Sequence, residues 1–174
     1  MVENMGPALS AGSGASPPRV SAVFDWLARA QAEPRQAYRE WTGCGVALLP
    51  LGRRFNAVRL PARLVHAGVG TADPDVVTAT LTELLHGPVI HNSPLQTYHA
   101  LLEPYPPHRW AYAHVAPMLG TGQFLGVPAA DLTGPTGLHW AVRPHAVGAL
   151  CSPPSVAALA ALGVRLLPRP ADIR

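Results

Sequence analysis

Residues 45–61 read GVALLPLGRRFNAVRLP, and this stretch indicates two short strands joined by a turn. The run 45–49 is apolar throughout, as expected of a buried strand. Residues 50–54 are typical of a turn, because proline and glycine favour turn conformations. Residues 55–60 then alternate roughly, which places Val58 and Leu60 on one face of a second strand that Pro61 ends. We therefore expect a sheet that begins in this stretch.

Helical patterns lie on both sides of these two strands. The predicted helices cover residues 20–32, the segment from Pro34 to Gly43, and residues 62–67, 74–86 and 153–162. The helix over 74–86 has the clearest signals, because Asp73 is a good N-cap and Pro74 suits the first helical position. Gly87 then follows its last turn, as is common after a helix.

Further strands are expected between and after the helices. They cover residues 88–91, 97–103, 123–127 and 138–142, with an edge strand over 164–167. Residues 104–122 are rich in proline and glycine and predict a long irregular segment. Helices that alternate irregularly with short strands favour an α+β fold, in which helices cover a mixed, mostly antiparallel sheet.

Length and composition predict a single domain. The chain has 174 residues, of which 48% are hydrophobic and 13% charged, which suits one domain with its own core and excludes wholesale disorder. We place this domain at residues 19–168, between a disordered N-terminal tail (1–18) and a C-terminal tail (169–174). No apolar run approaches the roughly 20 residues that span a bilayer. The N-terminus also lacks a signal-peptide pattern, so we expect a cytoplasmic protein without membrane contacts.

Common motifs of nucleophilic and metal catalysis are missing from the sequence. There is no G-x-S-x-G elbow, and the glycine-rich stretch 120–126 lacks the lysine and the following helix of a phosphate loop. The eight histidines are His66, His86, His91, His99, His108, His114, His139 and His145. They include no H-E-x-x-H pair and have few acidic neighbours, which favours surface or core roles over metal binding. We predict no catalytic residue, no metal site and no cofactor.

Arginines are concentrated around the opening stretch. Residues 35–63 contain six arginines and one acid, a charge of +5, whereas the remaining seven arginines and nine acids give −2. All 13 basic residues are arginines, whose guanidinium group suits phosphate. The candidate contacts for nucleic acid or nucleotide phosphates are Arg53, Arg54, Arg59 and Arg63, with Phe55, Tyr38 and Trp41 as residues that stack on bases. The alternative is a solvated surface in an arginine-biased chain.

A second group of aromatic and basic residues lies in the irregular segment, where residues 108–114 read HRWAYAH. Trp110 and Tyr112 are candidates for base stacking or for contact with a protein partner, because exposed aromatic side chains in a long loop often mark a binding surface. The alternative is that both fold back onto the core as a lid.

The stretch 45–61, together with Trp41 before it, resembles small actinomycete proteins related to the N-terminal domain of bifunctional DNA primase/polymerases. The segments TYHALLEP (97–104), FLGVP (124–128) and HWAVRP (139–144) resemble later strands of the same family. The similarity covers residues 19–168. It implies an α+β sheet domain, in agreement with the pattern of elements.

This resemblance implies binding without polymerase chemistry. Polymerases of the family hold two divalent metals on an acidic pair at the end of a strand, whereas the matching stretch here begins with Asn56 and contains no carboxylate. A neutral amide brings no charge to offset a dication, so the chain is interpreted as a non-catalytic member. His99 is carried over as a contact to a nucleotide phosphate. The alternative is a small protein-interaction or regulatory module without nucleic-acid binding.

Overall fold

A computed structural model describes residues 18–104 and 109–168. Residues 1–17 of the predicted N-terminal tail (1–18) and the predicted C-terminal tail (169–174) therefore lie outside the described residues, whereas Pro18 begins the first helix. The helices are α1 (Pro18–Ala28), α2 (Pro34–Cys44), α3 (Ala62–Val69), α4 (Pro74–Leu85) and α5 (Pro153–Leu166). The strands are β1 (Val46–Pro50), β2 (Asn56–Pro61), β3 (Val89–Asn92), β4 (Thr97–Leu102), β5 (Met118–Leu119), β6 (Phe124–Pro128) and β7 (Leu138–Val142). The predicted α+β class is thereby confirmed. None of the described helices has the length and apolar character that crossing a membrane requires.

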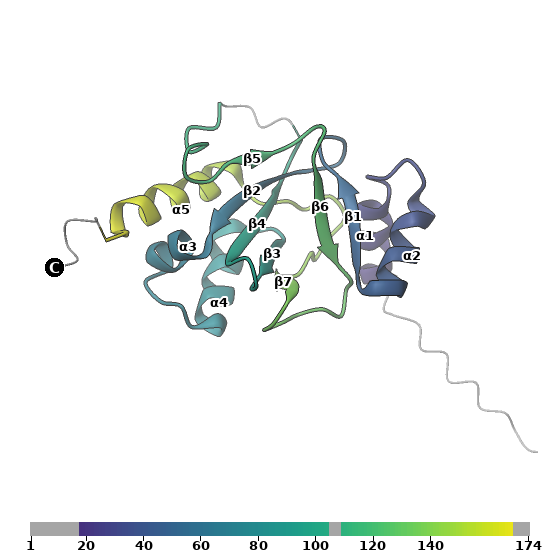
Figure 1. Ribbon diagram of the computed structural model, residues 1–174, viewed down its shortest axis with the longest axis horizontal. Helices are drawn as coiled ribbons and strands as arrows, with labels where there is room; N and C mark the ends of the chain where they lie inside the picture. The colour runs from purple at the N-terminus through teal and green to yellow at the C-terminus, as the bar shows by residue number, and fades with distance from the viewer. Residues whose placement is uncertain (1–17, 105–108, 169–174) are drawn as a thin grey trace, which may run out of the picture.

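The larger sheet has five strands in the order β5-β2-β4-β3-β7, and every neighbouring pair is antiparallel (Figure 1). The central strand β4 pairs with β2 on one side and β3 on the other, so His99 lies opposite Arg59 in one direction and Ile90 in the other. The turn that joins β3 to β4 is held by the Asn92 side chain, whose Oδ1 accepts a hydrogen bond from the Leu95 amide at 3.1 Å.

The two strands predicted in residues 45–61 belong to different sheets. β1 pairs with β6 in a separate two-stranded antiparallel sheet, whereas β2 joins the larger one. Side chains of the N-terminal region occupy part of the open edge of β1. The Leu48 amide donates to Glu40 Oε2 at 2.7 Å, and Gln31 Nε2 donates to the Leu48 carbonyl at 3.0 Å. These contacts satisfy backbone groups that an edge strand otherwise offers to another chain.

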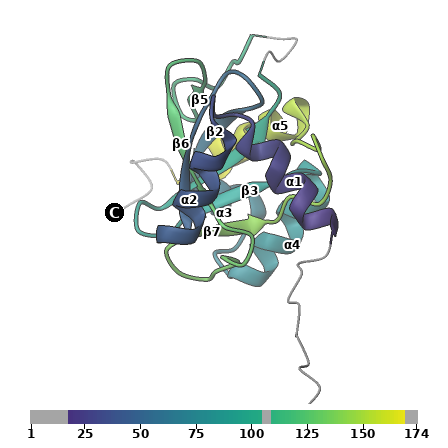
Figure 2. The same cartoon turned by 90° about the vertical axis from the view of Figure 1, so that its right-hand side faces the viewer.

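Two hydrophobic clusters cover the two faces of the larger sheet. One face packs against α3, α4 and α5, and the other packs against α1, α2 and the β1–β6 sheet (Figures 1 and 2). Alternation along β4 divides its side chains between the clusters, because successive residues of a strand point to opposite faces. Ala100 belongs to the cluster under α3–α5, and Leu101 to the other. The predicted common face of Val58 and Leu60 is confirmed, since both belong to the first cluster.

The predicted edge strand over 164–167 is wrong, because α5 continues through Gly163 to Leu166. Gly163 packs against α3, where a Cβ atom would lie 2.4 Å from the Leu64 carbonyl oxygen. Glycine ordinarily weakens a helix interior. Here it permits a close approach of two helices, and the packing energy of that approach outweighs the local preference. The irregular segment 104–122 also contains the short strand β5, which extends the sheet beside β2.

Candidate functional site

Two residues of the predicted phosphate-binding set, Arg59 and His99, are neighbours in the larger sheet. They lie directly opposite each other on β2 and β4, where cross-strand Cβ atoms are about 5 Å apart. The Arg59 side chain is exposed, whereas His99 is 7% exposed. Among the described residues, Arg59 forms no ion pair. The fold therefore places a free guanidinium group beside a buried imidazole ring.

His99 is uncharged at neutral pH in this environment. Burial lowers the pKa of His99 to about 4, and the positive charge of Arg59 contributes further in the same direction. Its Nδ1 atom is buried and has no hydrogen-bond partner among the described residues. Buried polar atoms usually have a partner, so an unpaired one is a position where a ligand or a water molecule is expected.

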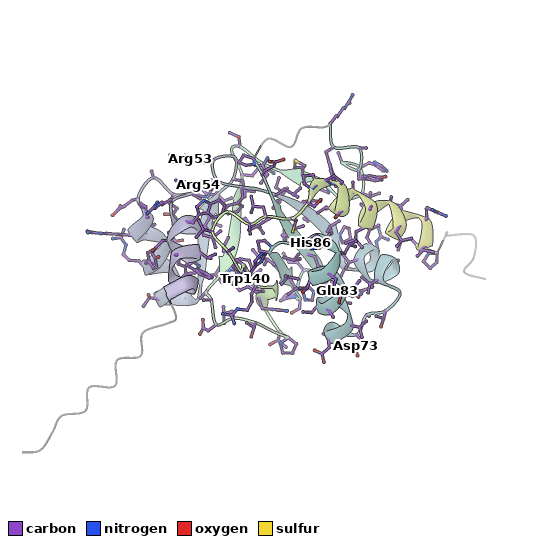
Figure 3. The ribbon with its side chains drawn as sticks, turned by 180° about the vertical axis from the view of Figure 1, so that it is seen from behind. Arg53, Arg54, Asp73, Glu83, His86 and Trp140 are labelled. Carbon is purple, nitrogen blue, oxygen red and sulfur yellow. The ribbon has the colours of Figure 1, made fainter. Side chains whose placement is uncertain are left out.

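The other predicted arginines do not converge on this point. Arg53 and Arg54 lie in the turn between β1 and β2, on the side of the molecule that carries α1 and α2 (Figure 3). Arg54 lies in the turn two residues before β2 begins, whereas Arg59 lies within β2. Arg63 is exposed in the first turn of α3. The arginines thus follow the length of β2 instead of surrounding one pocket.

Phe55 does not stack on bases, and this prediction is wrong. Its side chain has no exposed surface and belongs to the cluster under α1 and α2, where its ring lies 6.3 Å from that of Trp26. Trp41 is also buried, at 8% exposure, and its Nε1 donates to the Val127 carbonyl at 2.9 Å. These aromatic residues hold the N-terminal helices on the β1–β6 sheet, so packing accounts for them.

Trp110 and Tyr112 are half-buried and pack against the cluster under α3–α5. Trp110 Nε1 donates to the Ala116 carbonyl at 2.6 Å, and the two rings meet edge to face at 5.8 Å. This arrangement corresponds to the alternative of a lid that folds back onto the core. An exposed stacking platform is not formed by these two residues.

Asn56 stands at the start of β2, the position that the primase/polymerase resemblance assigns to a carboxylate. The side chain is 7% exposed, and its Nδ2 donates to the Pro104 carbonyl at 2.6 Å. Oδ1 has no partner among the described residues. The amide therefore fastens the start of the irregular segment to the sheet through a neutral hydrogen bond.

A second polar cluster lies on the α4 side of the sheet, and the sequence did not indicate it. Tyr98 is its centre: its Oη lies 3.2 Å from His66 Nε2, and its ring stacks on that of His91 with centroids 4.1 Å apart. The His139 ring meets the His91 ring edge to face at 5.0 Å. The sheet register brings His91 and His139 together, because β3 pairs with both β4 and β7, and the packing of α3 adds His66. The sequence signal for this cluster was the presence of two polar residues, His91 and His139, in predicted strands.

No three histidine, cysteine, aspartate or glutamate side chains within the described ranges are arranged to hold a metal ion. Comparisons with protein-family models, curated proteins and solved structures found no match to this chain. The resemblance to primase/polymerase domains therefore stays a prediction, and the proposals below depend on geometry and charge.

Proposed function

We propose that this protein binds a phosphate-bearing ligand, a nucleotide or a nucleic-acid strand, at the sheet face where Arg59 and His99 meet. The observation that carries the proposal is the pairing of an exposed, unpaired guanidinium group with a buried imidazole whose Nδ1 has no partner among the described residues. Guanidinium groups bind phosphate oxygens with two parallel hydrogen bonds. The adjacent imidazole supplies a further hydrogen-bonding group on the same face.

The two side chains have different roles in this proposal. Arg59 carries the positive charge at every physiological pH, because arginine does not lose its proton in proteins. His99 is neutral, since burial lowers its pKa to about 4, and it contacts the ligand as a hydrogen-bonding ring. No catalytic step is proposed, because the strand position that the resemblance assigns to a metal-binding carboxylate holds Asn56.

The distribution of the arginines favours an extended ligand. A single phosphate group contacts Arg59 and His99 alone, whereas a strand of several nucleotides also reaches Arg54 or Arg63 along the direction of β2. Phosphate contacts with arginine contribute more to binding affinity at low salt concentration, because binding releases counterions from the nucleic acid. Salt dependence therefore reports how many arginines take part.

The test measures fluorescence anisotropy of a labelled single-stranded oligonucleotide over a salt series. We expect Arg59→Gln to weaken binding by about tenfold at low salt and to reduce the salt slope by about one. The matched control is Arg165→Gln, which removes one positive charge from an exposed position on α5. We expect this control to bind like the unmodified protein, because its charge lies outside the proposed site.

Equal losses in the two arginine variants would show a diffuse effect of net charge and contradict the proposed site. The absence of any binding at low salt would contradict the function itself. Competition with inorganic phosphate and with a mononucleotide distinguishes a single phosphate site from a longer track. If neither competitor displaces the oligonucleotide, the oligonucleotide also contacts arginines other than Arg59.

A second candidate function, protein interaction, is favoured by a different surface from the one the sequence suggested. Leu48 and Phe124 are 55% and 59% exposed on the outer face of the β1–β6 sheet, and both line a shallow groove beside α2. Exposed large apolar side chains that adjoin each other often mark a contact with another protein. A partner retained by the unmodified protein and lost by Phe124→Ser would support this function.

A further inference from the structure

A cleft lies between the first turn of α4 and strands β3, β4 and β7. It consists of two adjoining cavities of about 300 and 290 Å³. Their shared lining residues are Pro74, Thr78, Pro135, His139 and Ala141. Cavities of this size bind small molecules in other proteins. The cleft occupies the face of the sheet that packs against α3–α5, so it is independent of the phosphate site proposed at Arg59 and His99.

The polar groups of this cleft include hydrogen-bond acceptors. His139 Nδ1 lies 3.1 Å from the Gly137 carbonyl oxygen, which can only accept, so Nδ1 carries the proton. In the tautomer that this contact selects, Nε2 is the acceptor atom of the ring. Tyr98 Oη and His66 Nε2 share one hydrogen bond, and His91 Nε2 is buried without a partner among the described residues.

The carboxylate of Asp75 lines the second cavity. No arginine among the described residues lines either cavity, although the chain has 13 arginines and a net charge of +3. Burial lowers the pKa of His91 to about 4, with contributions from His139 and His66, and burial also lowers the pKa of His66. These two rings are therefore uncharged at neutral pH, and neither of them neutralises an anion.

Beside Thr78, Gln96 and Thr133, the remaining lining is apolar or aromatic. Ala72, Pro74, Pro135 and Ala141 supply aliphatic surface, and Tyr98 with its stacked His91 supplies ring surface. Gly134 permits the loop to approach His139, because a Cβ atom there would lie 2.5 Å from His139 Cδ2. Aromatic surfaces attract organic cations through the negative charge of the ring face.

We propose that this cleft binds a small organic cation, a primary ammonium group attached to an apolar or aromatic body. The ammonium group has three N–H donors and no acceptor, which matches the Asp75 carboxylate of the second cavity and the Nε2 acceptor of His139, a residue that lines both cavities. The apolar body packs on the proline and alanine walls. A transition-metal ion is the competing occupant of a site with three histidines, but no described group of three ligands is arranged to hold one.

The experiment follows the imidazole Cε1–H resonances of the full chain by NMR during titration with 2-phenylethylammonium. We expect saturable shifts at His91 and His139. The neutral analogue 2-phenylethanol should bind about tenfold more weakly, because it lacks the charge-assisted hydrogen bonds, and the anion phenylacetate should not bind. Zinc chloride is titrated separately to test the metal.

Asp75→Asn provides the decisive variant, because its side chain is exposed and its loss does not disturb the core. We expect it to weaken binding of 2-phenylethylammonium by about fivefold, as for a partly exposed ion pair. The matched control is Glu83→Gln, which removes a carboxylate from the last turns of the same helix, away from the end that Asp73 caps (Figure 3). This control should bind like the unmodified protein.

Four outcomes would overturn the proposal: no shifts with the ammonium probe, equal binding of phenylacetate, shifts confined to histidines outside the cleft, or an Asp75→Asn variant that binds like Glu83→Gln. Stoichiometric shifts with zinc alone would assign the cleft to a metal and overturn it as well. Because the oligonucleotide assay uses a different face, failure here leaves the phosphate proposal standing, and the reverse also holds.

Discussion

His99 shows how one buried polar residue serves a fold and marks a candidate site at the same time. The ring lies between Arg59 and Ile90 in the sheet register and is almost fully enclosed. A buried histidine must stay neutral to remain in place, because protonation would put a second positive charge beside Arg59. The same enclosure leaves Nδ1 without a partner among the described residues.

Stability should therefore depend on pH through His99. The pKa is about 4 in the folded protein and about 6.5 in the unfolded chain, so the unfolded state binds the proton more tightly. The contribution of the neutral His99 ring to the free energy of unfolding is fully present above about pH 6.5 and is lost as the pH falls toward 4. For this nearly enclosed ring, the loss amounts to about 3 kcal/mol.

The measurement is urea unfolding at a series of pH values between about 7 and 4. A His99→Gln variant should have a lower stability at pH 7 and a shallower dependence on pH. Burial also lowers the pKa of His91, so His91→Gln serves as the parallel variant. The contribution of His99 is the part of the pH dependence of the unfolding free energy that changes in His99→Gln. A slope that is the same with and without His99 would contradict the argument.

At the scale of elements, the packing of α3 on α5 depends on the absence of a side chain. Gly163 brings α5 to within contact of the Leu64 backbone, and Gly68 on α3 lies against Leu159 in the same way. Helices approach this closely only where small residues face each other. The contact explains why α5 passes through a glycine that the sequence alone suggested as its end.

Gly163→Ala should destabilise the protein by about 1–3 kcal/mol, because the added methyl group would overlap the Leu64 carbonyl and force the helices apart. Gly43→Ala is the matched control. Gly43 lies within α2 with open space around the position of a Cβ atom, so the same change should stabilise by about 0.5–1 kcal/mol. Chemical denaturation of both variants measures the difference, and equal effects would rule out the packing explanation.

At the scale of the whole molecule, an aromatic cluster joins the N-terminal helices to the β1–β6 sheet and to the larger sheet. The Phe24 ring meets Trp41 at 5.1 Å and Trp140 at 6.2 Å, both edge to face. Trp41 Nε1 and Trp140 Nε1 donate to backbone carbonyls of β6. Residues from α1, α2 and β7 thereby hold the two sheets together.

Phe24→Ala should cost about 3–5 kcal/mol, because it removes a large buried side chain from the centre of this cluster. The loss should lower the stability of the whole domain in one cooperative transition, since the cluster connects both sheets. Urea unfolding followed by tryptophan fluorescence and by far-UV circular dichroism measures this. Transitions that separate for the two probes would show that the N-terminal helices unfold independently.

The sequence by itself determined most of the elements, because capping residues, prolines and apolar spacing act locally. The strand over 138–142 has the predicted bounds, and the helix from Pro74 begins at the Asp73 cap that the sequence indicated. Only the tertiary structure decided which strands pair. It placed β1 and β2 in different sheets and extended α5 through Gly163, because long-range packing outweighs a local preference of about 1 kcal/mol.

The candidate sites also combine features that the sequence determined with features that only the tertiary structure decided. Sequence determined where arginine is concentrated, but exposure depends on packing, so Arg59 is exposed while Phe55, four residues before it, is buried. The cleft around Tyr98 could not be predicted, because His66, His91 and His139 come from three elements that only the sheet register and the packing of α3 bring together. The chemical character of each side chain follows from the sequence, whereas the grouping of side chains into a site depends on contacts between residues that are distant in the sequence.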